Sequence, residues 1–321
     1  MTPAVSILVP IYNVSNFIER CAHSLFQQTF KDIEYVFVND CTPDDSIEKL
    51  QKVIAQYPDR KEQIKIVHHE KNRGLAAARN TAIDNSSGKY IQHIDSDDWV
   101  EIDMIEQLYN KAEAEQADIV VSDIFFESKN GQKIAKDFVA ENKDDNIKNA
   151  IEQIIVYTSL WSKLVLRELF RFSYPENLIY GEDRLSLIKL YFFSNKIVKI
   201  DKAFYHYNKT NESSITAQKT EFHFQQTILF WSLLDDFLEE TNISDKFSTA
   251  VEYSKTEAKV SLITKIGDYK LRKKYTYLFR DIEMKYISHF RLGEKLILFF
   301  THYRMYALAQ VTHWGIWVKN R

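Results

Sequence analysis

The chain has 321 residues, of which 45% are hydrophobic, so it can bury a sizeable core, and its length is typical of about two domains. Its two cysteines are too few for a disulfide framework and no charged, apolar leader opens the sequence, so we expect a reducing cytosol. The formal net charge of -3 conceals an asymmetry: residues 270–321 contain 11 Lys and Arg against 3 Asp and Glu, whereas residues 1–269 contain 31 against 42.

The first 126 residues alternate short apolar runs with amphipathic segments. The runs that we expect to form strands are Val5–Pro10, Ile33–Asn39, Ile64–His68, Tyr90–Ile94 and Ile119–Phe126. The segments that we expect to form helices are Ser15–Gln28, Asp44–Gln56, Leu75–Asp84 and Glu101–Glu115. This alternation is typical of a parallel sheet that helices cover on both faces.

Ligands of such sheets bind at the carboxyl ends of the strands, so the residues that follow each predicted strand are the candidates for a site. They are Tyr12 and Asn13, Asp40, His68 and His69, and the tetrad Asp95-Ser96-Asp97-Asp98. Three neighbouring carboxylates repel one another unless a cation lies among them. Oxygen ligands suit Mg²⁺ or Mn²⁺, which take their remaining ligands from water and substrate phosphates. The alternative is an acidic turn in which Asp97 or Asp98 caps the next helix.

The first predicted strand leads into Val9-Pro10-Ile11-Tyr12-Asn13 and not into a glycine-rich phosphate loop. A phosphate bound without such a loop needs a metal, which favours a metal site at the tetrad. Asp40, at the end of the second strand, could accept hydrogen bonds from a base N–H or from ribose hydroxyls. Its alternative role is to cap the helix that begins at Asp44, although Asp44 or Thr42 could provide that cap.

The predicted secondary structure changes after residue 126. Lys129-Asn130-Gly131 has the signature of a tight hairpin turn, so the parallel pattern is expected to end there. Residues 146–193 are predicted to be mostly helical, with an interruption at Tyr174-Pro175-Glu176-Asn177. Two short strands, Lys196–Ile200 and Ala203–Tyr207, are expected to close this part near residue 215, and the chain is predicted to be helical from about residue 220.

Several motifs of the chain occur together in a known family. The runs VSILVPIYNVSNFIERCAHSLFQQTFKDIEYVFVNDCTPDDS, NRGLAAARNTAI and GKYIQHIDSDDW resemble, in order and spacing, the nucleotide-sugar-binding half of family 2 glycosyltransferases with the GT-A fold. The resemblance covers residues 4 to about 215. It implies an α/β fold of GT-A type: a Rossmann-like, mostly parallel sheet flanked by helices, followed by a smaller helical C-terminal region.

The same resemblance implies a division of the chain. A catalytic domain is expected over residues 1–215, with nucleotide-sugar binding in residues 1–126 and the acceptor side and catalytic base in residues 127–215. A helical, basic and aromatic-rich region is expected over residues 216–321.

The resemblance also implies roles for residues on the donor side. Pro10, Tyr12, Asn13 and Asp40 match the nucleotide pocket, with Asp40 as the carboxylate that meets uracil. In the D-x-D element Asp95-Ser96-Asp97, Asp97 is expected to bind the metal directly and Asp95 to lie nearer the ribose or a metal-bound water. Asp98 matches a position that is frequently acidic.

Asn72, Gly74, Arg79 and Asn80 match the segment N-x-G-x-x-x-A-R-N of the family. Gly74 permits a tight turn into the following helix. Arg79 is expected either to pair with a phosphate or to brace the acidic tetrad, and the sequence leaves both roles open.

The catalytic base is expected in Leu178-Ile179-Tyr180-Gly181-Glu182-Asp183-Arg184, which resembles the E-D element of the family. We expect Asp183 to be the base, with Glu182 as the substitute, because the start of a helix stabilises the anionic form of a carboxylate. Simple capping of that helix is the alternative.

Further contacts to the diphosphate or the acceptor are expected from two segments. Tyr205-His206-Tyr207-Asn208-Lys209 and Ser213-Ser214-Ile215 resemble the closing strand and flexible loop of the family, which makes His206 and Lys209 candidates, although a lone His in a strand is often only packed. Trp161-Ser162-Lys163-Leu164 resembles a W-N-K-L element with Ser in place of the usual Asn, and it adds Trp161 and Lys163.

The function that the resemblance implies is an inverting transfer of a hexose or N-acetylhexosamine from a nucleoside diphosphate sugar, expected to be UDP-linked. The acceptor is expected to be a hydroxyl of a glycan or lipid-linked oligosaccharide in surface polysaccharide synthesis, and the cofactor Mn²⁺ or Mg²⁺. Two alternatives are a non-catalytic nucleotide-sugar or glycan-binding module, which would lack the tetrad or the E-D element, and a sugar nucleotidyltransferase, which commonly carries a basic glycine-rich loop.

The basic tail, residues 270–321, predicts a further partner. Leu296, Phe299, Phe300, Tyr303, Ala307 and Val311 fall near helical spacing within residues 291–318. Arg304 and two histidines interrupt this segment, which argues against a transmembrane helix. We expect it to lie on an anionic membrane, at the inner face of the plasma membrane, or to pack on the catalytic domain. Nucleic acid is not expected, because no RNA-binding motif accompanies the charge.

Overall fold

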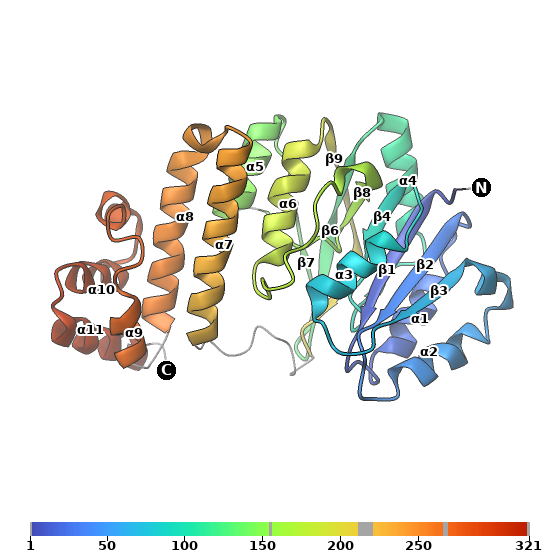
Figure 1. Ribbon diagram of the computed structural model, residues 1–321, viewed down its shortest axis with the longest axis horizontal. Helices are drawn as coiled ribbons and strands as arrows, with labels where there is room; N and C mark the ends of the chain where they lie inside the picture. The colour runs from blue at the N-terminus through green and yellow to red at the C-terminus, as the bar shows by residue number, and fades with distance from the viewer. Residues whose placement is uncertain (1, 154–155, 211–220, 266–268, 320–321) are drawn as a thin grey trace. The chain divides into compact units, whose positions relative to one another are not determined.

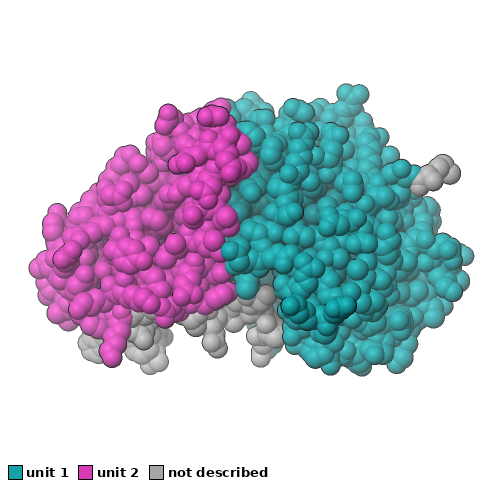
Figure 2. Space-filling model, viewed as in Figure 1, with its two compact units in different colours: residues 1–213 teal, residues 214–321 magenta. Residues whose placement is uncertain are grey.

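The computed structural model describes residues 2–153, 156–210, 221–265 and 269–319 (Figure 1). Contacts within the chain divide it into two compact units, residues 1–213 and residues 214–321, which are coloured separately in Figure 2. The predicted flexible loop Ser213-Ser214-Ile215 lies outside the described residues.

The N-terminal unit contains one sheet, with nine strands among its described residues. The strands are β1 (Val5–Ile11), β2 (Ile33–Asn39), β3 (Ile64–His68), β4 (Tyr90–His93), β5 (Trp99–Val100), β6 (Ile119–Ser128), β7 (Gly131–Ala135), β8 (Lys163–Leu166) and β9 (Ile197–Asn208). Their order is β3-β2-β1-β4-β8-β6-β9-β5, and β7 pairs with β6. Strands β3, β2, β1 and β4 are parallel, as are β6 and β9, whereas β8 is antiparallel to both β4 and β6.

Helices cover both faces of the parallel half of the sheet (Figure 1). The contacts of the buried strand β1 show this. Every residue of β1 is buried, and alternate residues point to opposite faces. Ile7 and Val9 pack in one cluster with residues of α1, α2 and α4, while Leu8 packs with Ala78 and Ala82 of α3. The helices of this unit are α1 (Ile18–Phe26), α2 (Ser46–Ile54), α3 (Leu75–Asp84), α4 (Met104–Glu115), α5 (Lys143–Glu152) and α6 (Glu182–Phe193), with short 3-10 helices at Pro58–Gln63 and Arg167–Leu169.

The structure confirms the predicted fold class and the strands and helices of the first 126 residues. Strands β2 and β3 and helix α3 have the predicted bounds, and the other predicted ends differ by at most three residues. The predicted hairpin joins β6 to β7, with Ser128 opposite Gly131, and Gly131 has a φ of 109°. The strands that precede the candidate residues of the first 126 residues, β1 to β4, are therefore parallel, as predicted.

Two predictions for residues 146–207 were wrong. Helix α5 ends at Glu152 and α6 begins at Glu182, and the described residues between them are not helical apart from the 3-10 helix Arg167–Leu169. They include strand β8, which is inserted between β4 and β6. The two short strands expected at 196–207 form one strand, β9. The pairing register of β9 with β6 shifts between Ser122–Ile200 and Asp123–Ala203, so a bulge bends the strand where two strands were expected.

The C-terminal unit is helical, as predicted. Its helices are α7 (Glu221–Glu240), α8 (Ser244–Lys265), α9 (Tyr269–Tyr275), a 3-10 helix at Glu283–His289, α10 (Leu292–His302) and α11 (Tyr306–Lys319). Helices α7 and α8 lie side by side as a hairpin (Figure 1). A buried ion pair between Lys259 and Glu283 joins α8 to the 3-10 helix, and His302 bonds the other oxygen of Glu283 at 2.6 Å.

The single helix suggested by the spacing within residues 291–318 is instead two helices. Arg304 has a φ of 60°, and the N–H of Met305 donates to the carbonyl of Phe300 at 2.7 Å, so α10 ends in a left-handed cap before α11 begins. Among the described residues, no helix combines the length and the apolar character that crossing a membrane requires.

Candidate functional site

The loops after β1 and β2 form one side of the candidate site. Pro10 is buried in β1. It lies beyond Leu8–His93, the last residue pair between β1 and β4, so the N–H that proline lacks is not needed for pairing with β4. Tyr12 is 48% exposed, and Asn13 has a φ of 56°. The N–H of Asn13 donates to the hydroxyl of Thr42 at 2.8 Å, which ties the two loops together beside the exposed Tyr12 ring.

Asp40 organises the loop that leads into α3. Its buried carboxylate accepts hydrogen bonds from the backbone N–H groups of Arg73 and Gly74, both at 2.8 Å, and lies 2.7 Å from Nδ1 of His69. Gly74 precedes α3 with a φ of 88°, as the tight turn predicts. Asp44, and not Asp40, bonds the start of α2 through the N–H of Ser46. Asp40 thus fixes the loop that carries the exposed Asn72, and its contact with uracil stays a prediction.

The acidic tetrad is divided between two environments. Asp95 and Asp97 are half-buried, whereas Ser96 and Asp98 are buried. The hydroxyl of Tyr205 donates to Asp98 at 2.6 Å, and the backbone N–H of Asn208 donates to it at 2.7 Å. Burial, reinforced by repulsion from Asp97 and Asp95, raises the pKa of the Asp98 carboxyl well above its usual range. Asp98 therefore anchors the tetrad to the end of β9, and Asp95 and Asp97 are the acids with solvent access.

Arg79 joins the tetrad to the E-D element. Its side chain is 2% exposed, its Nη2 lies 3.2 Å from Asp95, and its Nη1 lies 3.2 Å from Glu182 and 2.5 Å from Asp183. Burial alone would lower the pKa of Arg79, but the three carboxylates raise it further than burial lowers it. Of the two roles that the sequence left open for Arg79, this geometry is that of a brace for the acids.

The E-D element begins α6. Gly181 caps the helix with a φ of 98°, so Glu182 and Asp183 occupy its first turn. Burial, with repulsion from Asp183, raises the pKa of Glu182 to about 7, and burial also raises the pKa of Asp183, although Arg79 opposes this rise. Burial of this pair therefore acts against the preference of the helix terminus for the ionised carboxylates. The Asp183 side chain is 21% exposed against 12% for Glu182, which makes Asp183 the more accessible of the two carboxylates.

The last residue of the A-R-N motif holds the loop that leads to the E-D element. The side chain of Asn80 donates to the carbonyl of Tyr174 at 2.9 Å and accepts from the N–H of Tyr174 at 2.7 Å. On the same loop, Glu176 pairs with Arg73 at 2.7 Å. The segment around α3 thus contacts both the acidic tetrad and the loop that leads to the E-D element. No local pattern in the sequence points to Tyr174, since only the fold brings it to Asn80.

The candidates for diphosphate or acceptor contacts differ in their surroundings. Lys163 is fully buried, and its ammonium bonds Asp137 at 3.0 Å and the carbonyls of Tyr157 and Ser159, so in this structure it is a structural ion pair. Trp161 is also buried and stacks on Tyr205, with ring centroids 4.2 Å apart.

His206 and Lys209 lie toward the end of β9. His206 is buried, with its ring nitrogens 2.8 Å from Glu127 and 2.9 Å from Glu101, and it stacks on Trp99. His206 is therefore packed against its neighbours, which is the alternative that the sequence left open for a single histidine in a strand. Lys209 is exposed, and its ammonium lies 3.8 Å from the centre of the Phe126 ring.

The carboxylates of the tetrad fit a divalent cation whose remaining ligands come from the substrate. Among the described residues, no group of three or more His, Cys, Asp or Glu side chains is arranged to hold a metal. Mg²⁺ and Mn²⁺ sites of phosphate-transferring enzymes, however, commonly use one or two carboxylates together with substrate phosphates. Asp95 and Asp97, the two acids of the tetrad with solvent access, match that smaller requirement.

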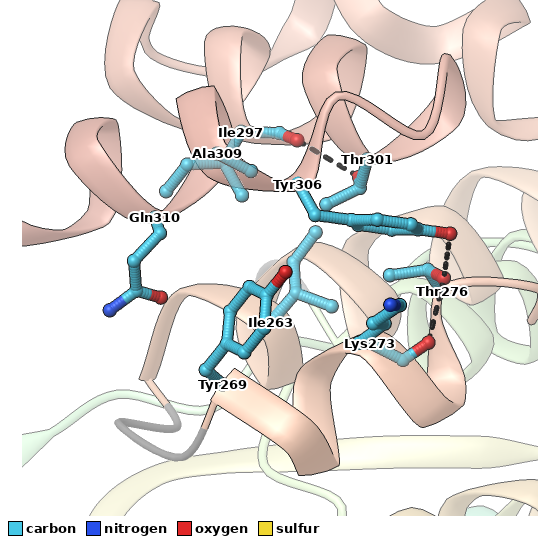
Figure 3. Close-up of a pocket in the computed structure, with 9 residues that line it drawn as sticks. All are labelled: Ile263, Tyr269, Lys273, Thr276, Ile297, Thr301, Tyr306, Ala309 and Gln310. Carbon is cyan, nitrogen blue, oxygen red and sulfur yellow. Dashed lines mark hydrogen bonds between the residues drawn. The ribbon is translucent and has the colours of Figure 1, made fainter.

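A small hollow lies within the C-terminal unit, and none of the residues above lines it (Figure 3). Ile263, Ile297 and Ala309 supply its apolar wall, and the ring of Tyr306 lies beside Thr276, whose hydroxyl is 3.3 Å from that of Tyr306. The hollow has room for little more than a water molecule, and its lining includes no carboxylate. It is therefore not a second candidate for the catalytic site.

The chain is similar to known proteins over much of its length. A family model described as glycosyl transferase family 2 matches residues 6–172, more than half of the chain. Glycosyltransferase GlyA of Streptococcus pneumoniae serotype 4 is 35% identical over 68% of this chain and 32% of its own length. The uncharacterized glycosyltransferase EpsJ of Bacillus subtilis is 34% identical over 67% of this chain and 64% of its own length. The chain thus spans less than two thirds of either relative.

Among solved structures, residues 1–349 of S. aureus TarS in complex with UDP-GlcNAc align with a TM-score of 0.74 over 98% of this chain and 91% of that one. The sequences are 18% identical, so this likeness shows a shared fold, which is the predicted GT-A fold. Together with the match over residues 6–172, the order of strands and motifs shows that the chain belongs to glycosyl transferase family 2.

Proposed function

We propose that this chain transfers a hexose or N-acetylhexosamine from a UDP-sugar, with inversion, to a hydroxyl of a surface polysaccharide or lipid-linked oligosaccharide. The observation that carries the proposal is the placement of Arg79 between Asp95 of the D-x-D element and Asp183 of the E-D element. An inverting transfer needs a base for the acceptor beside the groups that bind the donor diphosphate. One buried arginine holds both in this fold.

The choice of donor is supported by a structural neighbour, and the class of reaction by two relatives. TarS, which shares the fold, forms a complex with UDP-GlcNAc, and GlyA and EpsJ are named as bacterial glycosyltransferases. The exposed ring of Tyr12 follows β1, which pairs with β4 just before the tetrad, and the loop fixed by Asp40 is the second segment to which a nucleotide could bind. We therefore place the nucleotide between the ends of β1 and β2 and the sugar toward Asp183.

In the proposed reaction, the carboxylate of Asp183 takes the proton of the acceptor hydroxyl while that oxygen forms a bond to the anomeric carbon. The bond from that carbon to the diphosphate breaks, and the nucleoside diphosphate leaves from the opposite face. Arg79 keeps the Asp183 carboxylate oriented and offsets the charge of its neighbours. No covalent sugar intermediate forms, so one base is enough.

Asp97 and Asp95 would hold Mn²⁺ or Mg²⁺ together with the donor. The bound cation would neutralise the charge that develops on the leaving diphosphate. Asp98, which bonds Tyr205 and Asn208, would keep the tetrad in place without binding the cation.

The roles of the two acids are separable by substitution. We expect Asp183→Asn to abolish turnover and to leave Mn²⁺-dependent binding of UDP-sugar intact, because the substitution removes the base alone. Asp97→Ala should weaken that binding, because it removes a cation ligand. Asp201→Asn is the matched control, since Asp201 is 90% exposed and pairs only locally with Lys199 among the contacts described.

The measurements are sugar transfer or donor hydrolysis and calorimetric binding, with UDP-, GDP- and dTDP-sugars compared in the presence of Mn²⁺. Near-normal turnover of Asp183→Asn would remove the base assignment, and turnover lost in Glu182→Gln but kept in Asp183→Asn would move the role to Glu182. A wild-type protein that binds a UDP-sugar but transfers it to no acceptor hydroxyl and no water would instead be a binding module. Silence with every UDP-sugar would overturn the donor class.

A further inference from the structure

Helix α10 exposes a row of large apolar side chains. Leu292 is 74% exposed, Leu296 38%, Phe299 39% and Tyr303, at the end of the helix, 54%. Their spacing of four, three and four residues places them on one face of a helix with 3.6 residues per turn. The rings of Phe299 and Tyr303 lie together, with centroids 4.7 Å apart. We refer to these four side chains as the α10 stripe.

The opposite face of α10 already fills the core of the C-terminal unit. Ile297, Leu298 and Thr301 are buried, and the first two pack with Val260 and Ile263 of α8. The α10 stripe is therefore not the face by which the helix folds into its own unit. A helix with one apolar face in the core and a second in water exposes a surface that needs its own explanation.

Exposed apolar side chains are concentrated in this part of the chain. Of the sixteen large apolar side chains that are exposed among the described residues, seven fall between positions 292 and 311. Besides the stripe, they are Met305, Leu308 and Val311. Scattered single exposures are ordinary in folded proteins, but a row on one helix face followed by three more is typical of a binding surface.

Positive charge flanks the α10 stripe. Arg291 and Arg304, at the two ends of the helix, are exposed, and Lys295 on its side is half-buried. The acid within this helix, Glu294, accepts a hydrogen bond from the backbone N–H of Arg291 and so is used in capping. Residues 284–312 contain four Lys and Arg against one Asp or Glu. The surface therefore combines an apolar row with a basic border.

We propose that the α10 stripe lies in the headgroup region of an anionic lipid bilayer, with the helix parallel to the membrane. Apolar and aromatic side chains on one face with Lys and Arg at its edges are the composition of an interfacial helix. Tyr303 suits this depth, because its ring is apolar and its hydroxyl reaches water. The basic border would gain from anionic headgroups. A second copy of the chain is disfavoured, because a symmetric contact through this face would bring its basic borders together.

The proposal is independent of the transferase reaction and is tested without it. The full chain is sedimented with vesicles of phosphatidylcholine and with vesicles that also contain phosphatidylglycerol. We expect binding to the anionic vesicles that weakens as salt is added, and little binding to the neutral ones. Replacing the stripe by Leu292→Ser, Leu296→Ser and Phe299→Ser should lower the vesicle affinity about tenfold or more, which corresponds to about 1.4 kcal/mol or more.

Two control variants make the result specific. Ile102→Ser with Ile134→Ser removes apolar side chains that are 50% and 61% exposed in the N-terminal unit, and it should leave vesicle binding unchanged. Arg291→Gln with Lys295→Gln keeps the stripe and should weaken binding at low salt more than at high salt. Each variant is first shown to unfold at the wild-type temperature, so that a loss of binding reports the surface and not the fold.

Three outcomes would overturn the proposal. One is that the wild-type chain does not bind anionic vesicles, and another is that the Ile102 and Ile134 control loses as much binding as the stripe variant. The third is a self-associated wild-type chain, seen by light scattering, that the stripe substitutions convert to a monomer without changing vesicle binding. That result would assign the stripe to a second copy of the chain.

Discussion

Two arginines of one short segment have opposite surroundings. Arg79 is 2% exposed and contacts three carboxylates, whereas Arg73 is 41% exposed and pairs with Glu176, itself 48% exposed. A buried cation that offsets several acids is costly to remove, because the acids stay behind in a medium of low polarity. An exposed pair gains little, because water and salt screen it. The two residues therefore form a matched pair for testing which contacts hold the site.

We expect Arg79→Gln to lower the free energy of unfolding by about 3–5 kcal/mol near neutral pH, and Arg73→Gln by no more than about 1 kcal/mol. The loss in Arg79→Gln should shrink in acid, because Glu182 and Asp183 can then protonate and no longer need a cation. Urea unfolding at about pH 5 and about pH 8 measures both effects. Equal losses in the two variants, or a loss in Arg79→Gln that does not depend on pH, would contradict this account of the cluster.

Much of the candidate site could be predicted from sequence at the level of position, but not of partners. The tetrad, Asp40 and the E-D element were found because strand ends and motif spacing fix where such residues lie. Their contacts depend on segments far away in sequence: Asp98 is held by Tyr205 and Asn208 more than 100 residues later. The surroundings of Lys163 were equally unpredictable. It is buried beside Asp137 because β8 is inserted into the sheet, and β8 was not predicted from the sequence.

At the scale of elements, the local sequence pattern predicted the regular strands and helices correctly. It failed for elements whose structure depends on pairing with distant strands. Strands β1 to β4 alternate with helices of clear periodicity, so each is predictable within its own segment. Strand β8 has four residues and exists because β4 and β6 pair with it on either side. Its apolar residues Leu164, Val165 and Leu166 are consecutive, and so short an apolar run does not distinguish a strand from a buried helix, which explains the incorrect prediction. The bulge in β9 likewise arises from its register with β6.

The start of α6 shows how burial competes with a helix terminus. The terminus favours an ionised Glu182, but burial and Asp183 raise its pKa to about 7 in the folded chain, against a usual value of 4.5. Between these two values the folded state binds more protons at this residue than the unfolded state does. The contribution of Glu182 to stability is therefore fully present below the lower value and is lost as the pH rises toward the higher one.

We expect Glu182→Gln to remove this pH dependence. The unfolding free energy of the wild type should fall relative to that of Glu182→Gln as the pH rises from about 4.5 to about 7, with a slope of up to about 1.4 kcal/mol per pH unit. Urea unfolding of both proteins across this range gives the difference directly, and groups that do not interact with Glu182 cancel. A difference that stays flat across the range, or that rises with pH, would show that the pKa of Glu182 is not raised.

At the scale of the whole molecule, the chain has apolar clusters in each of its two compact units. Leu8 is fully buried in a cluster with Val36, Ala78 and Ile91 of the N-terminal unit. Leu298 is fully buried in a cluster with Val260, Ile263 and Ile297 of the C-terminal unit. The charge also differs between the units, since residues 1–213 carry 26 Lys and Arg against 33 Asp and Glu, and residues 214–321 carry 16 against 12. These features suit a division of labour between catalysis and surface binding.

If the two units unfold separately, a cavity in one core should leave the other protected. We expect Leu8→Ala and Leu298→Ala each to cost about 2–5 kcal/mol, because each removes a fully buried side chain. Hydrogen exchange read by mass spectrometry distinguishes the units: Leu8→Ala should speed exchange in peptides covering β1 and β2, and Leu298→Ala in peptides covering α8 and α10. Faster exchange in both units for either variant would mean that the chain unfolds as one cooperative body. In that case the surface proposed on α10 could not be altered without also changing the stability of the catalytic site.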